Sequence, residues 1–358
     1  MSDMRSQKWV SAFGAVAFLA AAGCSSGTVS DAVNEGADAV ASAVSPGVLS
    51  QVQSRGKVNC AVNSELPGFG SLDENGSFTG FDIDICRAVS AAVFGDPDQV
   101  EFKVVTSANR QTAIQSGEVD MISRNTTWTL TRDREWGATY GPTVYYDGQG
   151  FIVPVDTGIT TIEELDGATI CVIAGTTTEL NLADTFRSRG LEFTPVVFDG
   201  DDATFNAFEE GRCDANTGDQ SALISRRTQL QEPDSYLILE EVISKEPLGP
   251  LVKSGDPQWA DILNWTVWAM FYADEKGITS ENIDTFLDSE DPNIRRFVGA
   301  EGNMGELLGL DADFAVDVIK GVGNYSELFD RNLTPLGVSR GLNQSYTSGG
   351  ILYAPPFR

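Results

Sequence analysis

The sequence predicts an α/β protein with two similarly built lobes and a helical C-terminal extension. Residues 58–94 and 168–186 each run from an apolar strand, through a loop rich in polar residues, glycine or threonine, into a helical segment. The segments "AIQSGEVDMISRN" (113–125) and "AFEEGRCDANTGD" (207–219) place an alanine, a glycine and an aspartate at the same spacing. Beyond residue 258, apolar and aromatic residues recur at helical spacing. Strands that alternate with helices are typical of α/β folds.

Composition restricts the possible functions. The chain has 358 residues, of which 41% are hydrophobic, so it can form two domains of ordinary size. The net charge of −28 argues against a nucleic-acid partner, because affinity for phosphate comes largely from basic residues. The absence of histidine excludes catalysis by imidazole and zinc sites that use histidine. No CxxC pattern occurs, so a thiolate metal cluster is not expected. We also expect no other metal and no cofactor.

The N-terminus predicts export. Arg5 and Lys8 precede an apolar run from Trp9 to Gly23, which at fifteen residues is shorter than the roughly 20 needed to span a bilayer. We interpret residues 1–23 as a signal peptide. The run ends in small residues directly before Cys24, as in bacterial lipoprotein signals, although Ala21 stands where a leucine is usual. Cys24 is therefore expected to be lipidated, with plain secretion as the alternative.

Residues 24–47 are small, polar and acidic, and they predict a flexible tether. The mature protein is accordingly expected in the periplasm or at the cell surface.

The repeated motif also predicts where a ligand binds. In each copy a glycine ends a helix and the aspartate opens a short strand. Asn125 and Asp219 follow five residues after these aspartates, at the carboxyl ends of the strands. In open α/β sheets ligands bind at this edge. We therefore expect a small polar ligand between residues 125–132 and 176–219, although a glycine and aspartate after a helix are also common turn chemistry.

The remaining four cysteines predict one disulfide in each lobe. Cys60 and Cys171 lie on the first strands of the two halves, with Cys86 on the helix that follows one and Cys213 late in the other. We pair Cys60 with Cys86 and Cys171 with Cys213, each contributing roughly 3–4 kcal/mol by restricting the unfolded chain. The alternative is four buried thiols.

Two segments predict the crossings between the lobes. Residues 145–151 are rich in glycine, and residues 243–252 carry two prolines around a glycine. Both are typical of hinges. Lobe 1 is then expected to comprise residues 48–148 and 245–358, the second of which includes the C-terminal extension, and lobe 2 residues 149–244.

Several stretches together resemble a known family: "GFDIDICRAV", "AIQSGEVDMISRNTTWTLTRDRE", "YYDGQGF", "LDGATICVIAGTTTELNLADTFR", "EEGRCDANTGDQSAL", "ISKEPLGP" and "GGILYAPPFR". The chain is similar to the polar amino-acid-binding proteins of ABC uptake transporters, and within them to the general L-amino-acid-binding proteins. The likeness covers residues 48–358. It implies the type II periplasmic-binding-protein fold, an L-amino acid as ligand and the permease subunits of an ABC transporter as partners. It also implies no catalytic residue, and we expect a monomer.

The resemblance assigns roles in the motif T-x-T-x-x-R. Thr129 would cap the helix that aims Arg132 at the ligand carboxylate, with Thr127 beside it. The main-chain carbonyl of Asn125 would meet the ligand ammonium.

In lobe 2, Thr176 and Thr177 at a helix N-terminus would donate to the same carboxylate, and Asp219 would pair with the ammonium.

Specificity for the side chain of the ligand is expected to come from residues 63–69 and 107–111. Phe69 or Leu66 is expected to pack on the ligand. Arg110 would either meet acidic or amide side chains of the ligand or form a salt bridge on the surface. Arg124 is expected to be exposed.

Two alternatives belong to other classes. A dehydratase on the same fold would use an acid such as Glu179 or Glu65, and a sensor would use the fold as a ligand-binding domain. No P-loop motif is present, so energy for transport would come from another subunit.

Overall fold

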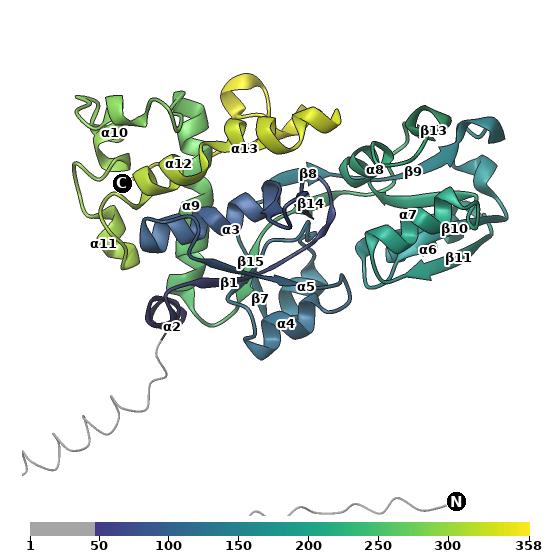
Figure 1. The fold of residues 1–358 in the computed structure, drawn as a ribbon, viewed down its shortest axis with the longest axis horizontal. Coiled ribbons are helices and arrows are strands. Elements are labelled where there is room, and N and C mark those ends of the chain that lie inside the picture. The colour runs from purple at the N-terminus through teal and green to yellow at the C-terminus, as the bar shows by residue number, and fades with distance from the viewer. Residues whose placement is uncertain (1–46) are drawn as a thin grey trace, which may run out of the picture. The chain divides into compact units, whose positions relative to one another are not determined.

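The computed structural model describes residues 47–358 (Figure 1). The predicted signal peptide, Cys24 and all of the predicted tether except Gly47 lie outside these residues.

The first sheet has five strands in the order β5-β1-β6-β15-β7. Its strands are β1 (Val58–Val62), β5 (Val100–Val104), β6 (Met121–Ile122), β7 (Ala138–Tyr140) and β15 (Leu251–Lys253). β1 runs parallel to β5 and β6, whereas β15 is antiparallel to β6 and β7. The helices of this part are α2 (Val48–Arg55), α3 (Phe81–Phe94), α4 (Arg110–Ser116) and α5 (Leu130–Glu135). We call this sheet and its helices lobe 1.

The second sheet has five strands in the order β11-β10-β12-β9-β13. Its strands are β9 (Gln149–Pro154), β10 (Ala168–Ile173), β11 (Phe193–Phe198), β12 (Ala215–Asp219) and β13 (Tyr236–Ile238). Its helices are α6 (Thr177–Arg189), α7 (Asp201–Glu209) and α8 (Gln220–Arg227), and we call this part lobe 2. Here β10 runs parallel to β11 and β12, and β9 is antiparallel to β12 and β13. The two sheets therefore share one topology.

The repeated aspartates hold equivalent places in the two sheets. The Asp120 carboxylate accepts from the N–H of Asn59 on β1 at 2.7 Å, and the Asp214 carboxylate accepts from the N–H of Thr169 on β10 at 2.7 Å. Each aspartate thus ties the start of its own strand to the neighbouring parallel strand, β1 in lobe 1 and β10 in lobe 2. The repeated spacing in the sequence therefore reflects the same hydrogen bond, from a main-chain N–H group to an aspartate, in both lobes.

The crossings between the lobes are β8 (Tyr145–Asp147) and β14 (Glu246–Leu248), which pair as a two-stranded antiparallel ribbon. Figure 1 shows this ribbon between the two lobes. The chain leaves lobe 1 through β8, builds lobe 2 and returns through β14. A small sheet of lobe 1 consists of β2 (Glu65–Leu66), β3 (Gly70–Leu72) and β4 (Phe78–Thr79).

The C-terminal region is helical, as predicted. It contains α9 (Pro257–Lys276), α10 (Pro292–Phe297), α11 (Met304–Leu308), α12 (Phe314–Val322) and α13 (Tyr325–Asn332). α9 begins where the Asp256 side chain accepts from the N–H of Trp259, with Pro257 in the first turn. Both α9 and α12 pack against α3 of lobe 1, so the extension shares one apolar core with that lobe.

Short 3-10 turns complete the fold: η1 (Val155–Thr157), η2 (Glu163–Leu165), η3 (Pro233–Ser235), η4 (Ile283–Phe286), η5 (Thr334–Leu336), η6 (Gly341–Asn343) and η7 (Tyr346–Ser348).

Both predicted disulfides are confirmed. Cys60–Cys86 joins β1 to α3 in lobe 1, and Cys171–Cys213 joins β10 to the turn before β12 in lobe 2. Within residues 47–358, no helix combines the length and the apolar character that a membrane crossing requires.

Candidate ligand-binding site between the lobes

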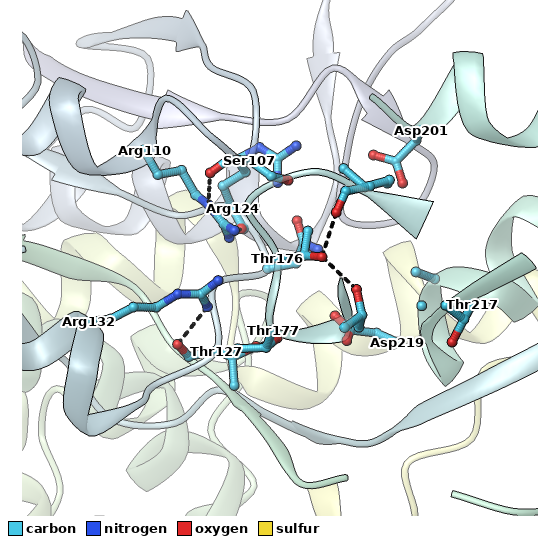
Figure 2. A pocket seen from close by; sticks show the side chains of 15 residues that line it. Ser107, Arg110, Arg124, Thr127, Arg132, Thr176, Thr177, Asp201, Thr217 and Asp219 are labelled. Atoms are coloured by element: carbon cyan, nitrogen blue, oxygen red, sulfur yellow. Dashed lines mark hydrogen bonds between the residues drawn. The ribbon is translucent and has the colours of Figure 1, made fainter. Parts of the chain in front are cut away.

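A cavity lies between the lobes, where the carboxyl ends of strands from both sheets meet (Figure 2). Its lining residues are Ser107, Arg110, Arg124, Asn125, Thr127, Arg132, Ile173, Thr176, Thr177, Thr178, Asp201, Thr217, Gly218, Asp219 and Ala222. The first six belong to lobe 1 and include three arginines, whereas the others belong to lobe 2 and include two aspartates. Figure 2 shows Arg110 and Arg132 on one side of the cavity and Asp219 on the other.

The lobes touch each other around this cavity. On one side, the Asn63 amide of lobe 1 donates to the Asp201 carboxylate of lobe 2 at 3.0 Å. On the rim, the guanidinium of Arg226 in lobe 2 donates to the carbonyl oxygen of Glu65 in lobe 1 at 2.9 Å. The structure therefore shows the two lobes in the closed arrangement.

Arg132 is held rigidly at the cavity wall. The Thr129 hydroxyl caps α5 by accepting from the Arg132 N–H at 3.2 Å. The Arg132 guanidinium donates to the Thr127 carbonyl at 2.9 Å and lies 5.0 Å from the centre of the Trp136 ring. Tyr140 donates its hydroxyl proton to the same carbonyl at 3.0 Å. With its side chain buried and its plane fixed, Arg132 can offer a preorganised pair of donors to a carboxylate.

The Asn125 loop is strained and is held by an acid that sequence reasoning missed. With φ of 32°, Asn125 is the sole non-glycine residue of the described chain in the left-handed region. Its N–H donates to the Asp82 carboxylate at 2.6 Å, and the Ser123 hydroxyl donates there at 3.1 Å. Burial raises the pKa of Asp82 to about 6. The aspartate belongs to the quoted "GFDID" run, and that run was the signal that could have revealed it.

In lobe 2, the start of α6 faces the cavity. The Thr176 hydroxyl accepts from the Glu179 N–H at 3.1 Å and donates to the Ile173 carbonyl at 2.7 Å. Because the first N–H groups of a helix have no partner within the helix, the backbone at Thr177 and Thr178 is available to an anion. An anion at this end of α6 would therefore meet main-chain N–H groups rather than the Thr176 hydroxyl.

Glu246 on β14 is the second residue that the sequence did not reveal. Its carboxylate is 1% exposed and accepts the hydroxyl protons of Thr127 at 2.6 Å and Thr177 at 2.8 Å. It also accepts from the Asn181 amide at 2.7 Å and the Ser244 hydroxyl at 2.5 Å. One carboxylate thus binds lobe 1, lobe 2 and the crossing strand together. Since both threonines donate to Glu246, their protons are not free for a ligand carboxylate in this arrangement.

Asp219 is a buried acid without a donor of its own. Its side chain is 8% exposed, and no described N–H or O–H group donates to its carboxylate. Burial, followed by the nearby Asp147 and Glu246, raises the pKa of Asp219 well above its usual value. Burial also raises the pKa of Asp147 to about 6. Three acids therefore lie close together at the crossing strands, and a cation between the lobes would stabilise the charged forms of Asp147 and Asp219.

Arg110 and Arg124 both lie in the cavity wall. Arg110 is 2% exposed, which rules out the surface alternative, and the expectation that Arg124 is exposed is wrong, because it is 3% exposed. Arg124 lies two residues after the end of β6, and its Nε donates inward to the Val105 carbonyl at 2.9 Å. Arg110 donates to the Ser107 carbonyl at 3.1 Å and to the Thr126 hydroxyl at 3.2 Å.

The structure does not bring Phe69 and Leu66 to the cavity. Both are fully buried in the core of lobe 1, where the Phe69 ring packs edge-on against Phe81 and Tyr145. The apolar lining comes from Ile173 and Ala222 instead. Of the predicted ligand-binding residues, the structure does bring seven to the cavity: Asn125, Thr127, Arg132, Thr176, Thr177, Asp219 and Arg110.

Two lobes of one topology, joined by a two-stranded ribbon around a charged cavity, define a solute-binding protein with the type II periplasmic-binding-protein fold. The chain belongs to the bacterial extracellular solute-binding proteins, family 3. The model of this family matches residues 58–276. It is thus an exported binding protein and not an enzyme.

Among its relatives, the general L-amino acid-binding periplasmic protein AapJ of Rhizobium johnstonii is 50% identical over 323 residues, covering 89% of this chain and 95% of that protein. The glutamate/glutamine/aspartate/asparagine-binding protein BztA of Rhodobacter capsulatus is 47% identical, covering 89% of this chain and 96% of that protein.

A solved structure of a periplasmic binding protein of an ABC transporter from Brucella ovis, with glutathione bound, is 47% identical. It has a TM-score of 0.85 and covers 88% of this chain and 100% of that chain.

Proposed function

We propose that this protein captures L-α-amino acids between its lobes and delivers them to the permease of an ABC transporter. The observation that carries the proposal is the division of charge across the cavity, with buried Arg132 in lobe 1 and buried Asp219 in lobe 2. An α-amino acid presents one carboxylate and one ammonium, so it can bridge the two lobes. The relatives named for amino-acid binding support the same ligand class.

The carboxylate of the ligand would lie against the Arg132 guanidinium and the first N–H groups of α6. A guanidinium offers a planar pair of donors, and the helix terminus adds backbone donors and a favourable dipole. Arg132 belongs to lobe 1 and α6 to lobe 2, so the carboxylate would be held from both sides. Closure of the lobes would then be coupled to binding.

The ammonium of the ligand would lie against Asp219, close to the carbonyl of Asn125. Asp219 has no donor in the described structure and is surrounded by other acids, so a buried cation would supply the missing partner. The Asn125 loop, fixed by Asp82, would present its carbonyl from lobe 1. No observation in the cavity favours a dehydratase, since neither Glu179 nor Glu65 lines it.

The ligand range extends to molecules that carry the same α-amino-carboxylate group. Glutathione, which the Brucella ovis protein holds, ends in such a group and therefore belongs in any ligand panel. The cleaved chain would be held at the membrane by a lipid on Cys24, or be released if Cys24 stays unmodified. We expect it to act as a monomer.

A thermal-shift panel of the twenty L-amino acids tests the proposal. The protein should first be unfolded and refolded to remove bound ligand. Several amino acids are expected to raise the melting temperature, because a ligand that binds only the folded state stabilises it. A panel without any shift, repeated by calorimetry, would overturn the proposal.

Arg132→Ala supplies the matching variant. We expect it to weaken binding of every amino acid by roughly 100-fold, because it removes the shared charged partner of the carboxylate. Arg134→Ala is the control, since Arg134 is an exposed arginine on the same helix. Equal affinities of Arg132→Ala and the control would show that Arg132 does not contact the ligand.

A further inference from the structure

The C-terminal extension contacts the strand through which the chain leaves lobe 1. Within the described residues, β8 pairs with β14 alone, so its other edge is left open. At Tyr146 that edge meets the side chain of Asn343 in η6. The Asn343 amide accepts from the Tyr146 N–H at 2.6 Å and donates to the Tyr146 carbonyl at 3.1 Å. Asn343 thus satisfies both main-chain groups of Tyr146, as a neighbouring strand would.

The two residues before Tyr146 are held by the extension as well. The Tyr325 hydroxyl on α13 donates to the Val144 carbonyl at 2.8 Å. The Phe329 ring, one turn further along α13, stacks on the Tyr145 ring with 6.3 Å between the centroids. Three consecutive residues that lead into the crossing are therefore held by side chains of the extension. These side chains lie beyond the part of the chain that the family model matches.

The Asn343 side chain is itself held in place by the rest of the extension. Asn343 is 2% exposed, and its main-chain carbonyl accepts from the Arg340 guanidinium at 3.1 Å. Arg340 also pairs with Asp274 of α9 at 3.2 Å and lies 5.1 Å from the centre of the Tyr325 ring. Because α9 packs against α3, the contact with the crossing strand is anchored in the core of lobe 1.

The residues that follow Tyr146 are bonded to the other lobe. The Asp147 carboxylate accepts from the N–H of Ser221 at 3.3 Å and from the hydroxyl of the same residue, which lies on α8 of lobe 2. The Gly148 carbonyl accepts from the Gln220 N–H at 2.8 Å. The chain therefore passes from lobe 1 to lobe 2 between Tyr146 and Asp147.

The returning chain changes lobes at the same level of the ribbon. Pro247 is opposite Tyr146 in the ribbon, and its carbonyl accepts from the Trp128 N–H of lobe 1 at 2.8 Å. Three residues earlier, the Ser244 hydroxyl accepts from the Gln149 N–H of lobe 2 at 3.2 Å. Both crossings thus change lobes just beyond the pair formed by Tyr146 and Pro247.

We infer that Asn343 and Tyr325 are positioning residues of the hinge, which hold the lobe 1 end of the ribbon so that the lobes pivot just beyond Tyr146. This role concerns closure on any ligand and goes beyond the proposed function. In the closed arrangement, contacts such as Asn63–Asp201 also restrain the ribbon. When the lobes part, these contacts are lost and the ribbon alone joins the lobes. Without Asn343 the open form gains conformational freedom, so closure costs more entropy.

Asn343→Leu tests this role, because leucine has a similar volume but neither accepts from nor donates to Tyr146. We expect every amino acid that the wild-type protein binds to bind roughly three- to tenfold more weakly, by the same factor for each ligand. Calorimetry on refolded ligand-free protein measures the affinities. In small-angle X-ray scattering, the radius of gyration of the variant should exceed that of the wild-type protein without ligand and match it at saturating ligand.

Asn282→Leu is the matched control. The Asn282 amide also accepts from a main-chain N–H, that of Thr279 at 2.7 Å, and donates to a main-chain carbonyl, that of Gly277 at 2.9 Å. These partners lie within the extension, so the control should change neither affinity nor radius. Equal behaviour of Asn343→Leu and Asn282→Leu would overturn the assigned role, as would a loss confined to ligands of one side-chain type.

A second variant decides the question if a thermal melt shows that Asn343→Leu is not folded. Tyr325→Phe keeps the ring but removes the donor to Val144. It should change affinity and radius in the same direction by a smaller factor, roughly two- to threefold in affinity. Its control is Tyr272→Phe, because the buried Tyr272 hydroxyl has no partner among the described residues. Equal behaviour of these two variants would then overturn the role of the extension in the hinge.

The outcomes also separate the hinge from the proposed function. If no amino acid binds to the wild-type protein, the proposed function fails. The radii of the ligand-free variants still test the hinge in that case, because they depend on no ligand. A ligand-free Asn343→Leu protein that is folded and has the wild-type radius would contradict the hinge role whichever solute the protein binds.

Discussion

The two lobes share a topology and differ in charge at the same place. Asn125 and Asp219 each lie five residues after the aspartate that ties their strand to its neighbour. Asn125 is itself in the left-handed region, and from there the lobe 1 chain leads to Arg132, whereas Asp219 leads directly into α8. The topology of the lobes therefore fixes where a ligand binds, and the side chains at that place decide which ligand binds. A zwitterion requires such an asymmetry.

Asp219→Asn removes the charge that lobe 2 presents to the cavity. We expect binding of amino acids to fall roughly 100-fold, because the ammonium loses its buried partner. Deaminated analogues such as α-keto acids should lose much less. Calorimetry with both ligand classes measures the difference, and equal losses would show that Asp219 has a structural role.

The same substitution should stabilise the empty protein. The charge of Asp219 is disfavoured by burial and by the nearby Asp147 and Glu246 more than Arg110 and Arg132 offset, so a neutral asparagine relieves this cost. The ligand-free melting temperature of Asp219→Asn is expected to rise by about 2 °C or more at neutral pH. A lower melting temperature would contradict this account of the acid cluster.

The connection between the lobes can be broken at Glu246. Glu246→Gln leaves the volume unchanged but replaces an acceptor of Thr127 and Thr177 with an amide donor. We expect all amino acids to bind roughly tenfold more weakly, irrespective of their side chains. Glu192→Gln is the control, because Glu192 is an exposed glutamate of lobe 2 outside the cavity lining. A loss confined to acidic ligands would place Glu246 in side-chain recognition rather than in closure.

The free energy of unfolding of the ligand-free protein is also expected to depend on pH, by a smaller amount. The pKa values of Asp82 and Asp147 are raised to about 6 in the folded protein from a usual value of 3.8. The folded state therefore binds more protons than the unfolded state between these values, and the stabilisation is lost as the pH rises through about 6. The free energy of unfolding of ligand-free protein should fall by roughly 1 kcal/mol or more from pH 5 to pH 7.

Denaturant titrations at several pH values measure this fall. Glu101, whose pKa is lowered to about 2, titrates below this window and does not interfere. A flat or rising profile between pH 5 and pH 7 would contradict the assigned pKa directions.

The sequence predicted the parts of the site that follow from local pattern. The repeated spacing predicted that Asn125 and Asp219 lie at the carboxyl ends of their strands, and the family resemblance assigned Thr129 as the cap that orients Arg132. The sequence did not reveal Glu246, because three of the four donors to that carboxylate come from two distant segments, the loop at Thr127 and the start of α6, which only folding brings together. The burial of Arg124 was missed for a related reason, since no local pattern shows which side of a strand end faces a second lobe.

The position of Phe69 was also beyond local pattern. Its ring lies between side chains from α3 and β8, which are distant in sequence. The structure therefore places Phe69 in the core of lobe 1 and not in the cavity lining.

The acid cluster at the crossing strands affects whether the lobes close in the absence of a ligand. Asp147, Asp219 and Glu246 repel one another when the lobes are shut without cargo, whereas water hydrates them when the lobes part. The ammonium of a bound amino acid would act as their counter-ion and make the shut form tolerable. In the proposed function, the ligand-free receptor would therefore favour the open arrangement. The transporter would then hydrolyse less ATP on receptors that carry no ligand.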